Sequence, residues 1–238
     1  MPTLRLEWGI DGLRRAMGRD DNIVIIDVLR FSSAVVTATA LGFTIIPNAT
    51  SNRKTESATL SPGYFLGKKP GRVTIFSSNG AFLAVSGVKA RHVIFGSLLN
   101  ARCAAEHIGG LNGDTSLIAA GEISESRTLL LGNHEKGLAS GNRIFCIEDM
   151  LGAGAISYFS HSHKSNECIK AEGLFTRRKK SLRAALANSA SGKYDKLHGN
   201  APDTLLCSGL NIYDVVPELG RANGTPLIHA AKENACGK

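Results

Sequence analysis

The sequence has no hydrophobic run long enough to cross a bilayer. Its longest mainly apolar stretch, residues 34–46, contains three threonines and is shorter than the roughly 20 apolar residues that a transmembrane helix needs. Arg5, Glu7 and Asp11 occupy positions at which a signal peptide would need an apolar segment. We therefore expect a soluble, cytoplasmic protein without a membrane partner.

Cysteine chemistry and the common cofactor motifs are also missing. The five cysteines are scattered, odd in number and free of any CxxC spacing, which argues against a zinc site or a disulfide framework and favours reduced, buried thiols. No GxGxxG motif occurs, the glycines before Lys68 lack the spacing of a P-loop, and His134-Glu135 is not part of an HExxH motif. These absences exclude the usual dinucleotide, nucleotide and zinc-protease signatures.

What is present is a globular composition with a basic charge. At 238 residues and 43% hydrophobic residues, the chain can form one domain spanning residues 1–238. The net charge of +8 favours anionic partners, and it suits a small polyanionic substrate as well as nucleic acid. The densest basic run, residues 177–180, has no interleaved aromatic residues, so a charged helix face is favoured over nucleic-acid binding. A homodimer is left open.

The most informative stretch is residues 22–42, NIVIIDVLRFSSAVVTATALG. Residues 23–26 predict a buried strand of a parallel sheet, because they form a short, continuous, β-branched run. Asp27 and Arg30 follow at once, Ser32 and Ser33 are expected to cap a helix over residues 34–41, and Gly42 is expected to end it.

The same strand–turn–helix pattern recurs along the chain. Strands are predicted at residues 43–47, 72–76, 92–95 and 116–120, and helices at 81–88, 101–108, 150–159 and 164–187. This alternation predicts an α/β fold with a mainly parallel sheet flanked by helices. Residues 123–143 are interpreted as a surface insertion, 194–198 as a loop, and 205–216 as a last strand or helix before a polar tail.

Polar residues gather in the turns that follow the predicted strands. Parallel strands end at one edge of a sheet, where α/β proteins bind ligands, so these turns are expected to meet. The acidic residues are all hard oxygen donors, which predicts Mg²⁺ as the metal. The candidate metal ligands are Asp27, Glu122, Glu148 and Asp149.

The anion-binding candidates include the turn Ser77-Ser78-Asn79-Gly80, whose hydroxyls and amides at a helix start suit phosphate. The predicted substrate-binding residues are Arg30, Ser32, Ser77, Ser78, Asn79, Gly80 and Asn100, and the predicted catalytic residues are Asp27, Arg30, Asn79 and Glu122. The nucleophile is left open between a metal-bound water and the hydroxyls of Ser32, Ser33, Ser77 and Ser78.

Several segments resemble the ComB family of 2-phosphosulfolactate phosphatases. They are IIDVLRFSSAVVTATALG, LSPGYF, FSSNGAFLA, GSLLNARCAAEHI, AAGE, IEDMLGAGAI and CSGLNIYDV, in the order seen in that family. The resemblance implies a ComB-like fold and a Mg²⁺-dependent phosphatase that converts 2-phospho-3-sulfolactate to 3-sulfolactate, a step towards coenzyme M. By position, it matches Asp27, Glu148 and Asp149 to acidic residues of the family, and Arg30, Asn79-Gly80 and Asn100 to its anion-handling turns.

The sequence also departs from the family pattern, and two other functions stay open. A Gly-Glu-Arg segment has no counterpart within residues 48–70, an Asn-Ser-Pro element is reduced to Ser61-Pro62, and Ile123 stands where arginine is often found. The missing segment favours an anion-binding protein of this fold without turnover. A nucleic-acid-binding module using the basic helix at residues 170–183 is the other alternative, and its binding would depend steeply on salt.

Overall fold

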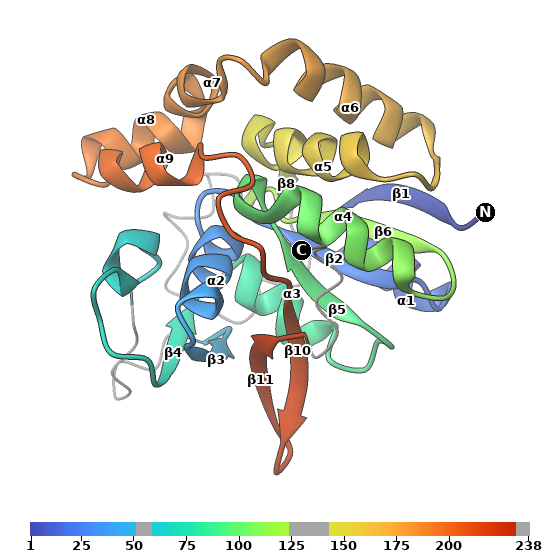
Figure 1. Cartoon of the computed structure of the whole chain (residues 1–238), viewed down its shortest axis with the longest axis horizontal. Coiled ribbons are helices and arrows are strands. Elements are labelled where there is room, and N and C mark those ends of the chain that lie inside the picture. Colours follow the sequence, from blue (N-terminus) through green and yellow to red (C-terminus); the bar gives the residue numbers. More distant parts are fainter. Residues whose placement is uncertain (51–58, 124–142, 232–238) are drawn as a thin grey trace.

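The computed structural model describes residues 1–50, 59–123 and 143–231. Their main feature is a nine-stranded sheet with the order β4-β3-β11-β10-β5-β2-β6-β1-β9, and β7 and β8 form a separate ladder (Figure 1). The strands are β1 Thr3–Trp8, β2 Asn22–Ile26, β3 Thr44–Asn48, β4 Arg72–Phe76, β5 Val93–Gly96, β6 Thr115–Ala119, β7 Glu122–Ile123, β8 Arg143–Ile144, β9 His163–Lys164, β10 Pro217–Ala222 and β11 Thr225–Ala230. The helices are α1 Gly9–Gly18, α2 Phe31–Ala40, η1 Pro62–Phe65, α3 Gly80–Ser86, η2 Leu98–Asn100, α4 Ala101–Gly110, α5 Ile147–Phe159, α6 Asn166–Arg178, α7 Leu182–Asn188, α8 Ala190–Leu197 and α9 Ala201–Cys207.

The central strand β2 shows why the predicted apolar run forms a buried strand. It pairs in parallel with β5 on one side and β6 on the other, so both of its faces are covered. Val24 and Ile26 pack into the core shared with α4, α5 and α6, whereas Ile23 and Ile25 pack into the core shared with α1, α2 and α3. The mainly parallel α/β fold predicted from the sequence is confirmed.

Close helix packing covers one of these faces. In Figure 1, α5 and α6 lie side by side beyond β1, and α7, α8 and α9 form a group at the end of α6. A Cβ atom at Gly154 of α5 would collide with the carbonyl oxygen of Ala171 in α6. Glycine at this position therefore allows the two helix backbones to approach each other.

The sheet differs from the prediction in an antiparallel hairpin, β10–β11, inserted between β5 and β3. A single residue pair joins it to each neighbour, Glu218 with Ile94 and Ile228 with Ile45. The predicted polar tail is wrong here, because Asn223 and Gly224 form a two-residue turn with φ of 51° and 80°, as a tight hairpin requires. Three antiparallel steps separate β5 from β3, so β3 and β4 run opposite to β2, β5 and β6.

Two local predictions need correction. Residues 194–198, predicted as a loop, belong largely to α8, whose N-cap Ser189 accepts a hydrogen bond from the Gly192 amide. The helix predicted to start at residue 34 begins at Phe31, so Ser32 lies in its first turn and does not cap it. Gly42 follows this helix with φ of 83°, as predicted for a helix stop.

The structure tests two expectations from the sequence, that the thiols are reduced and that no helix crosses a membrane. Cys146, Cys168 and Cys207 are buried thiols outside any disulfide, as expected, but Cys103 is bonded in a disulfide, which corrects the expectation of reduced thiols. Within the described ranges, every helix is too short or too polar to span a membrane.

Candidate active site

Asp27 is the centre of the predicted site, at the carboxyl end of β2. Its side chain is 7% exposed and accepts hydrogen bonds from the amide of Phe31, at 3.2 Å, and from the amide of Gly80. Burial raises the pKa of Asp27 to about 7, and the negative charges of Glu122 and Glu148 add to the rise. A Cβ atom at Gly80 would collide with the Phe31 ring, so only glycine brings this amide so close.

Asp149, in the first turn of α5, ties two turns of the sheet edge together. Its Oδ1 atom accepts a hydrogen bond from the Val28 amide at 2.8 Å, and its Oδ2 atom accepts one from the Gly121 amide at 2.9 Å. Burial raises the pKa of Asp149 well above its ordinary value, and Asp27 and Glu148 contribute further. Asp149 therefore fixes the turns after β2 and β6, with one backbone amide on each of its oxygens.

Glu148, beside Asp149, is the least compensated acid of the group. It is 3% exposed, and its carboxylate makes no hydrogen bond or ion pair with any residue that the structure describes. Its charge raises the pKa of both Asp27 and Asp149. A buried carboxylate without a donor is costly in a folded protein, so a cation is the natural partner for it.

Glu122 brings a further turn into the site. Its Oε1 atom accepts a hydrogen bond from Asn79 Nδ2 at 3.0 Å. The predicted meeting of these two turns is therefore found, but the reason given for it is wrong, because β4 runs opposite to β6. A shared strand direction therefore does not explain the contact between Asn79 and Glu122.

The four acids also act on Cys146, which precedes α5. Burial raises the pKa of the Cys146 thiol strongly, and Asp149, Glu148, Glu122 and Asp27 all raise it further. The thiol is therefore protonated near neutral pH and is a poor nucleophile.

The serines predicted for the site are mostly bound to the backbone. Ser77 Oγ accepts the amides of Asn79 and Gly80 at 3.2 and 3.1 Å, which uses two of the amides predicted to cradle phosphate. Ser32 Oγ accepts the Asp27 amide at 3.0 Å and donates to the Ile25 carbonyl, and Ser33 Oγ donates to the Val28 carbonyl. Ser78 makes no hydrogen bond within the described part of the chain.

The hydrogen bonds of Asn100 go to backbone groups and not to the acidic residues of the site. Asn100 is fully buried, its Oδ1 atom accepts the Ser97 amide at 2.9 Å, and its Nδ2 atom donates to the carbonyls of Phe95 and Val215 at 3.1 and 3.0 Å. These bonds close the turn after β5 and attach it to residue 215. The placement gives Asn100 a structural role and does not support the predicted substrate contact.

Arg30, the N-cap residue of α2, turns towards α8 and α9. Its Nη1 atom lies 2.7 Å from Asp203 Oδ2, and its Nη2 atom lies 3.6 Å from Asp195 Oδ1. Sequence reasoning missed both aspartates, because neither stands in a motif or near Arg30 in the chain. The Leu29–Arg30 peptide bond that leads into this residue is cis.

The donor set is suited to a hard cation. No group of three or more His, Cys, Asp and Glu side chains is close enough to hold a metal ion among the residues described here. Mg²⁺ is commonly held by one or two carboxylates, with waters and substrate oxygens completing its coordination. Asp27 and Glu148, which are buried, oxygen-bearing and mutually repulsive, fit that requirement.

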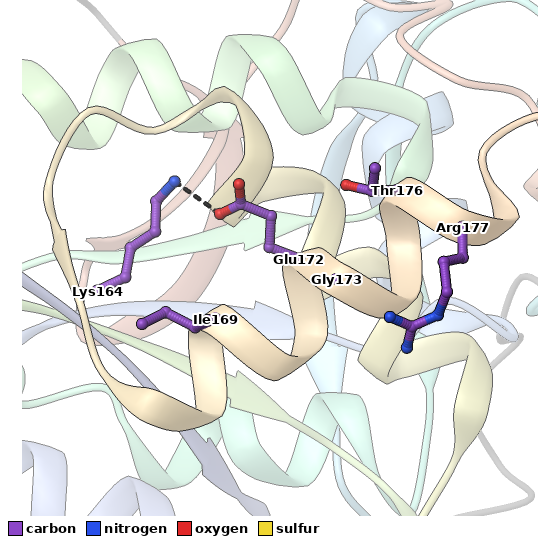
Figure 2. A pocket seen from close by; sticks show the side chains of 6 residues that line it. All are labelled: Lys164, Ile169, Glu172, Gly173, Thr176 and Arg177. Carbon is purple, nitrogen blue, oxygen red and sulfur yellow. Dashed lines mark hydrogen bonds and ion pairs between the residues drawn. The ribbon is translucent and has the colours of Figure 1, made fainter.

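A surface pocket lies elsewhere, over α6. Figure 2 shows Lys164 and Glu172 pointing towards each other at one end of it, 2.7 Å apart, and Arg177 at the other end. Ile169, Gly173 and Thr176 complete the lining. None of these residues belongs to the predicted site.

Acidic side chains at the carboxyl ends of parallel strands are the arrangement of an α/β enzyme whose site is built from strand-end turns. The model of the 2-phosphosulpholactate phosphatase family matches residues 59–222. The chain therefore belongs to this family of phosphoric monoester hydrolases, which confirms the resemblance found in the sequence. It is also 29% identical to a probable 2-phosphosulfolactate phosphatase of Carboxydothermus hydrogenoformans, over 90% of this chain and 92% of that protein.

Proposed function

We propose that this protein hydrolyses 2-phospho-3-sulfolactate to 3-sulfolactate and inorganic phosphate, with Mg²⁺ as its metal. Membership of the phosphatase family and the name of its relative support the substrate. The observation that carries the metal is the pair Asp27 and Glu148, two buried acids whose charges repel each other. A phosphorylated, sulfonated acid carries several negative charges, so it would bind beside these carboxylates only with a cation between them.

Asp27 and Glu148 would hold the metal, and Glu122 would stand beside them. When bound, Mg²⁺ would neutralise charge on the phosphoryl oxygens and withdraw electron density from phosphorus. Asp149 keeps the turns after β2 and β6 in place, and Asn79 orients Glu122. Arg30 supplies a positive charge three residues from Asp27.

We assign the attack on phosphorus to water. The hydroxyls of Ser32, Ser33 and Ser77 are bound to backbone groups, and the Cys146 thiol is held protonated, which leaves Ser78 as the competing nucleophile among these side chains. The water oxygen forms the new bond to phosphorus as the bond from phosphorus to the C2 oxygen of sulfolactate breaks. The attacking water gives up one proton and the C2 oxygen takes up one, so that it leaves as the alcohol.

The test is phosphate release from synthetic 2-phospho-3-sulfolactate, compared with a panel of small phosphoacids, in buffer with Mg²⁺ and in buffer with EDTA. We expect release from 2-phospho-3-sulfolactate at the highest kcat/KM and its loss in EDTA. Full activity in EDTA would remove the metal from the proposal, and preference for another phosphoacid would replace the substrate. Binding of the phosphoacid without phosphate release would support the binding protein without turnover.

A further inference from the structure

Arg30 is held by a buried cluster that links three distant segments. Its side chain is 16% exposed, and its two carboxylate partners come from α8 (Asp195) and α9 (Asp203). The shorter contact, 2.7 Å between Nη1 and Asp203 Oδ2, is a charge-assisted hydrogen bond. The guanidinium is thus held by carboxylates from two other helices.

The two carboxylates are themselves fixed. The second oxygen of Asp203, Oδ1, accepts a hydrogen bond from the Ser61 hydroxyl, just before η1. Asp195 Oδ2 accepts one from the Thr204 hydroxyl at 3.3 Å. Each acid therefore presents one oxygen to Arg30 while the other oxygen is anchored.

This arrangement leaves part of the guanidinium for another partner. A guanidinium carries five N–H groups in one rigid plane, and the contacts described above engage one at Nη1 and approach one at Nη2. Nε makes no hydrogen bond with any residue in the described ranges. A planar donor with one side anchored is preorganised to receive a carboxylate, sulfonate or phosphate on its other side.

We propose that Asp203 and Asp195 are positioning residues, which hold the Arg30 guanidinium beside the acidic site so that its remaining N–H groups bind an anionic group of the substrate. The inference rests on the proposed function and deepens it. It gives α8 and α9 a role in substrate binding through Arg30, although neither helix contributes a residue to the acidic site itself.

A purely structural ion pair is the competing explanation, and the chain offers a matched control for it. Asp21 is also buried and is paired with Arg19 and Arg5, but it precedes β2 and so lies at the other end of the strand from Asp27. Replacing Asp21 removes a buried charge from an arginine cluster without touching the site. An effect on substrate binding that Asp203→Asn has and Asp21→Asn lacks separates the two explanations.

The experiment is a double-mutant cycle on KM and kcat with 2-phospho-3-sulfolactate, using Arg30→Ala, Asp203→Asn and the double variant, with Asp21→Asn as control. We expect Asp203→Asn to raise KM about 10- to 100-fold, the range for residues that orient a ligand-binding side chain, with a smaller change in kcat. In the Arg30→Ala background, Asp203→Asn should add less than twofold, because Asp203 acts only through Arg30. Independent, multiplying effects, or an unchanged KM in Asp203→Asn, would overturn the inference.

Two further measurements apply if the Asp203 variant fails to fold or if the wild type releases no phosphate. If Asp203→Asn does not fold, Ser61→Ala takes its place; it keeps both charges but frees the Asp203 carboxylate, and a rise in KM of several-fold is expected. If the wild type releases no phosphate from 2-phospho-3-sulfolactate, the proposed function fails alone. The inference is then decided by calorimetric binding of 3-sulfolactate and inorganic phosphate, which Arg30→Ala and Asp203→Asn should weaken equally. Equal binding by wild type and variants, or no binding by the wild type, would overturn it.

Discussion

The strand β2 has a buried aspartate at each end, and the two have opposite surroundings. Asp21, which precedes the strand, is 2% exposed, lies 3.0 Å from Arg19 Nε and 3.6 Å from Arg5 Nη1, and accepts the Ser116 hydroxyl at 2.7 Å. Asp27, which follows the strand, has Glu122 and Glu148 as the strongest charges acting on it. The first acid is compensated by arginines and the second is surrounded by other acids.

This difference separates an acid whose buried charge is compensated by arginines from one whose buried charge is opposed by other acids. A buried carboxylate paired with arginine repays part of its desolvation, whereas buried carboxylates that face each other raise one another's pKa and oppose folding. Groups perturbed in this way concentrate at functional sites. The charges around the two aspartates therefore indicate a structural role for Asp21 and a functional role for Asp27.

The largest effect should come from neutralising the aspartate at either end of β2. Asp27→Asn should lower kcat/KM at least about 100-fold, the scale of losing one preorganised electrostatic group, with little loss of stability. Asp21→Asn should leave kcat/KM within about twofold but lower the free energy of unfolding by about 2–3 kcal/mol, since its arginines are only partly buried. Steady-state kinetics and urea unfolding of both variants measure this; a similar pattern in the two would abolish the distinction.

Asn100 sharpens the comparison, because it closes the turn after β5, the strand beside β2, but is bonded as a structural residue. Asn100→Ala should leave three backbone groups without their partner and lower the free energy of unfolding by about 2–3 kcal/mol. Activity per folded molecule should change less than threefold. A large rise in KM with unchanged stability would return Asn100 to the substrate-binding residues.

Magnesium should act only at the acidic end of β2. At a free concentration about ten times its Kd, Mg²⁺ should stabilise the wild type by about 1.4 kcal/mol. Glu148→Gln should weaken this shift, and Asp21→Asn should retain it. Thermal unfolding with and without the metal measures both, and an equal shift in Glu148→Gln would take Glu148 out of the metal site.

The last effect expected is a pH dependence of stability in metal-free buffer. Asp27 has an ordinary pKa of 3.8 and a folded-state pKa of about 7, so the folded protein holds this proton more tightly than the unfolded chain. Its contribution is complete below about pH 4 and is lost as the pH rises towards 7, with a slope of at most about 1.4 kcal/mol per pH unit. Asp27→Asn should reduce the slope but not remove it, because burial also raises the pKa of Asp149. A wild-type stability that rises with pH between 5 and 7 would contradict the assignment.

The parts of this fold that the sequence predicted are those set by local patterns. The strand at residues 72–76 was predicted with the bounds that the structure has, because its ends are marked by charged and polar residues. Asp27 and Glu122 follow β2 and β6, which are parallel neighbours, and the charge of Glu122 acts on Asp27, as the rule that parallel strands share an edge predicts. The hairpin was missed although Asn223-Gly224, a strong hairpin signal, was present in the sequence.

The contacts that the sequence did not predict join residues far apart in the chain. The Arg30–Asp203 bond spans 173 positions and the Ser61–Asp203 bond spans 142, and nothing in the neighbourhood of either residue specifies the partner. Asn79 was placed correctly for the wrong reason, since strand direction depends on a hairpin that was not predicted. Local patterns specify elements, whereas these contacts depend on how the elements pack.

The β10–β11 hairpin also determines the order in which the sheet can be completed as the chain is synthesised. β3 and β4 emerge from the ribosome long before residues 217–230, yet they join the five strands β5, β2, β6, β1 and β9 of their sheet only through that hairpin. Until it docks, β3 and β5 each keep an edge open to pairing with another chain. Closing such long-range contacts is slow and leaves a nascent chain exposed to aggregation. A ribosome that pauses before residue 217 would prolong the exposure of these two strand edges.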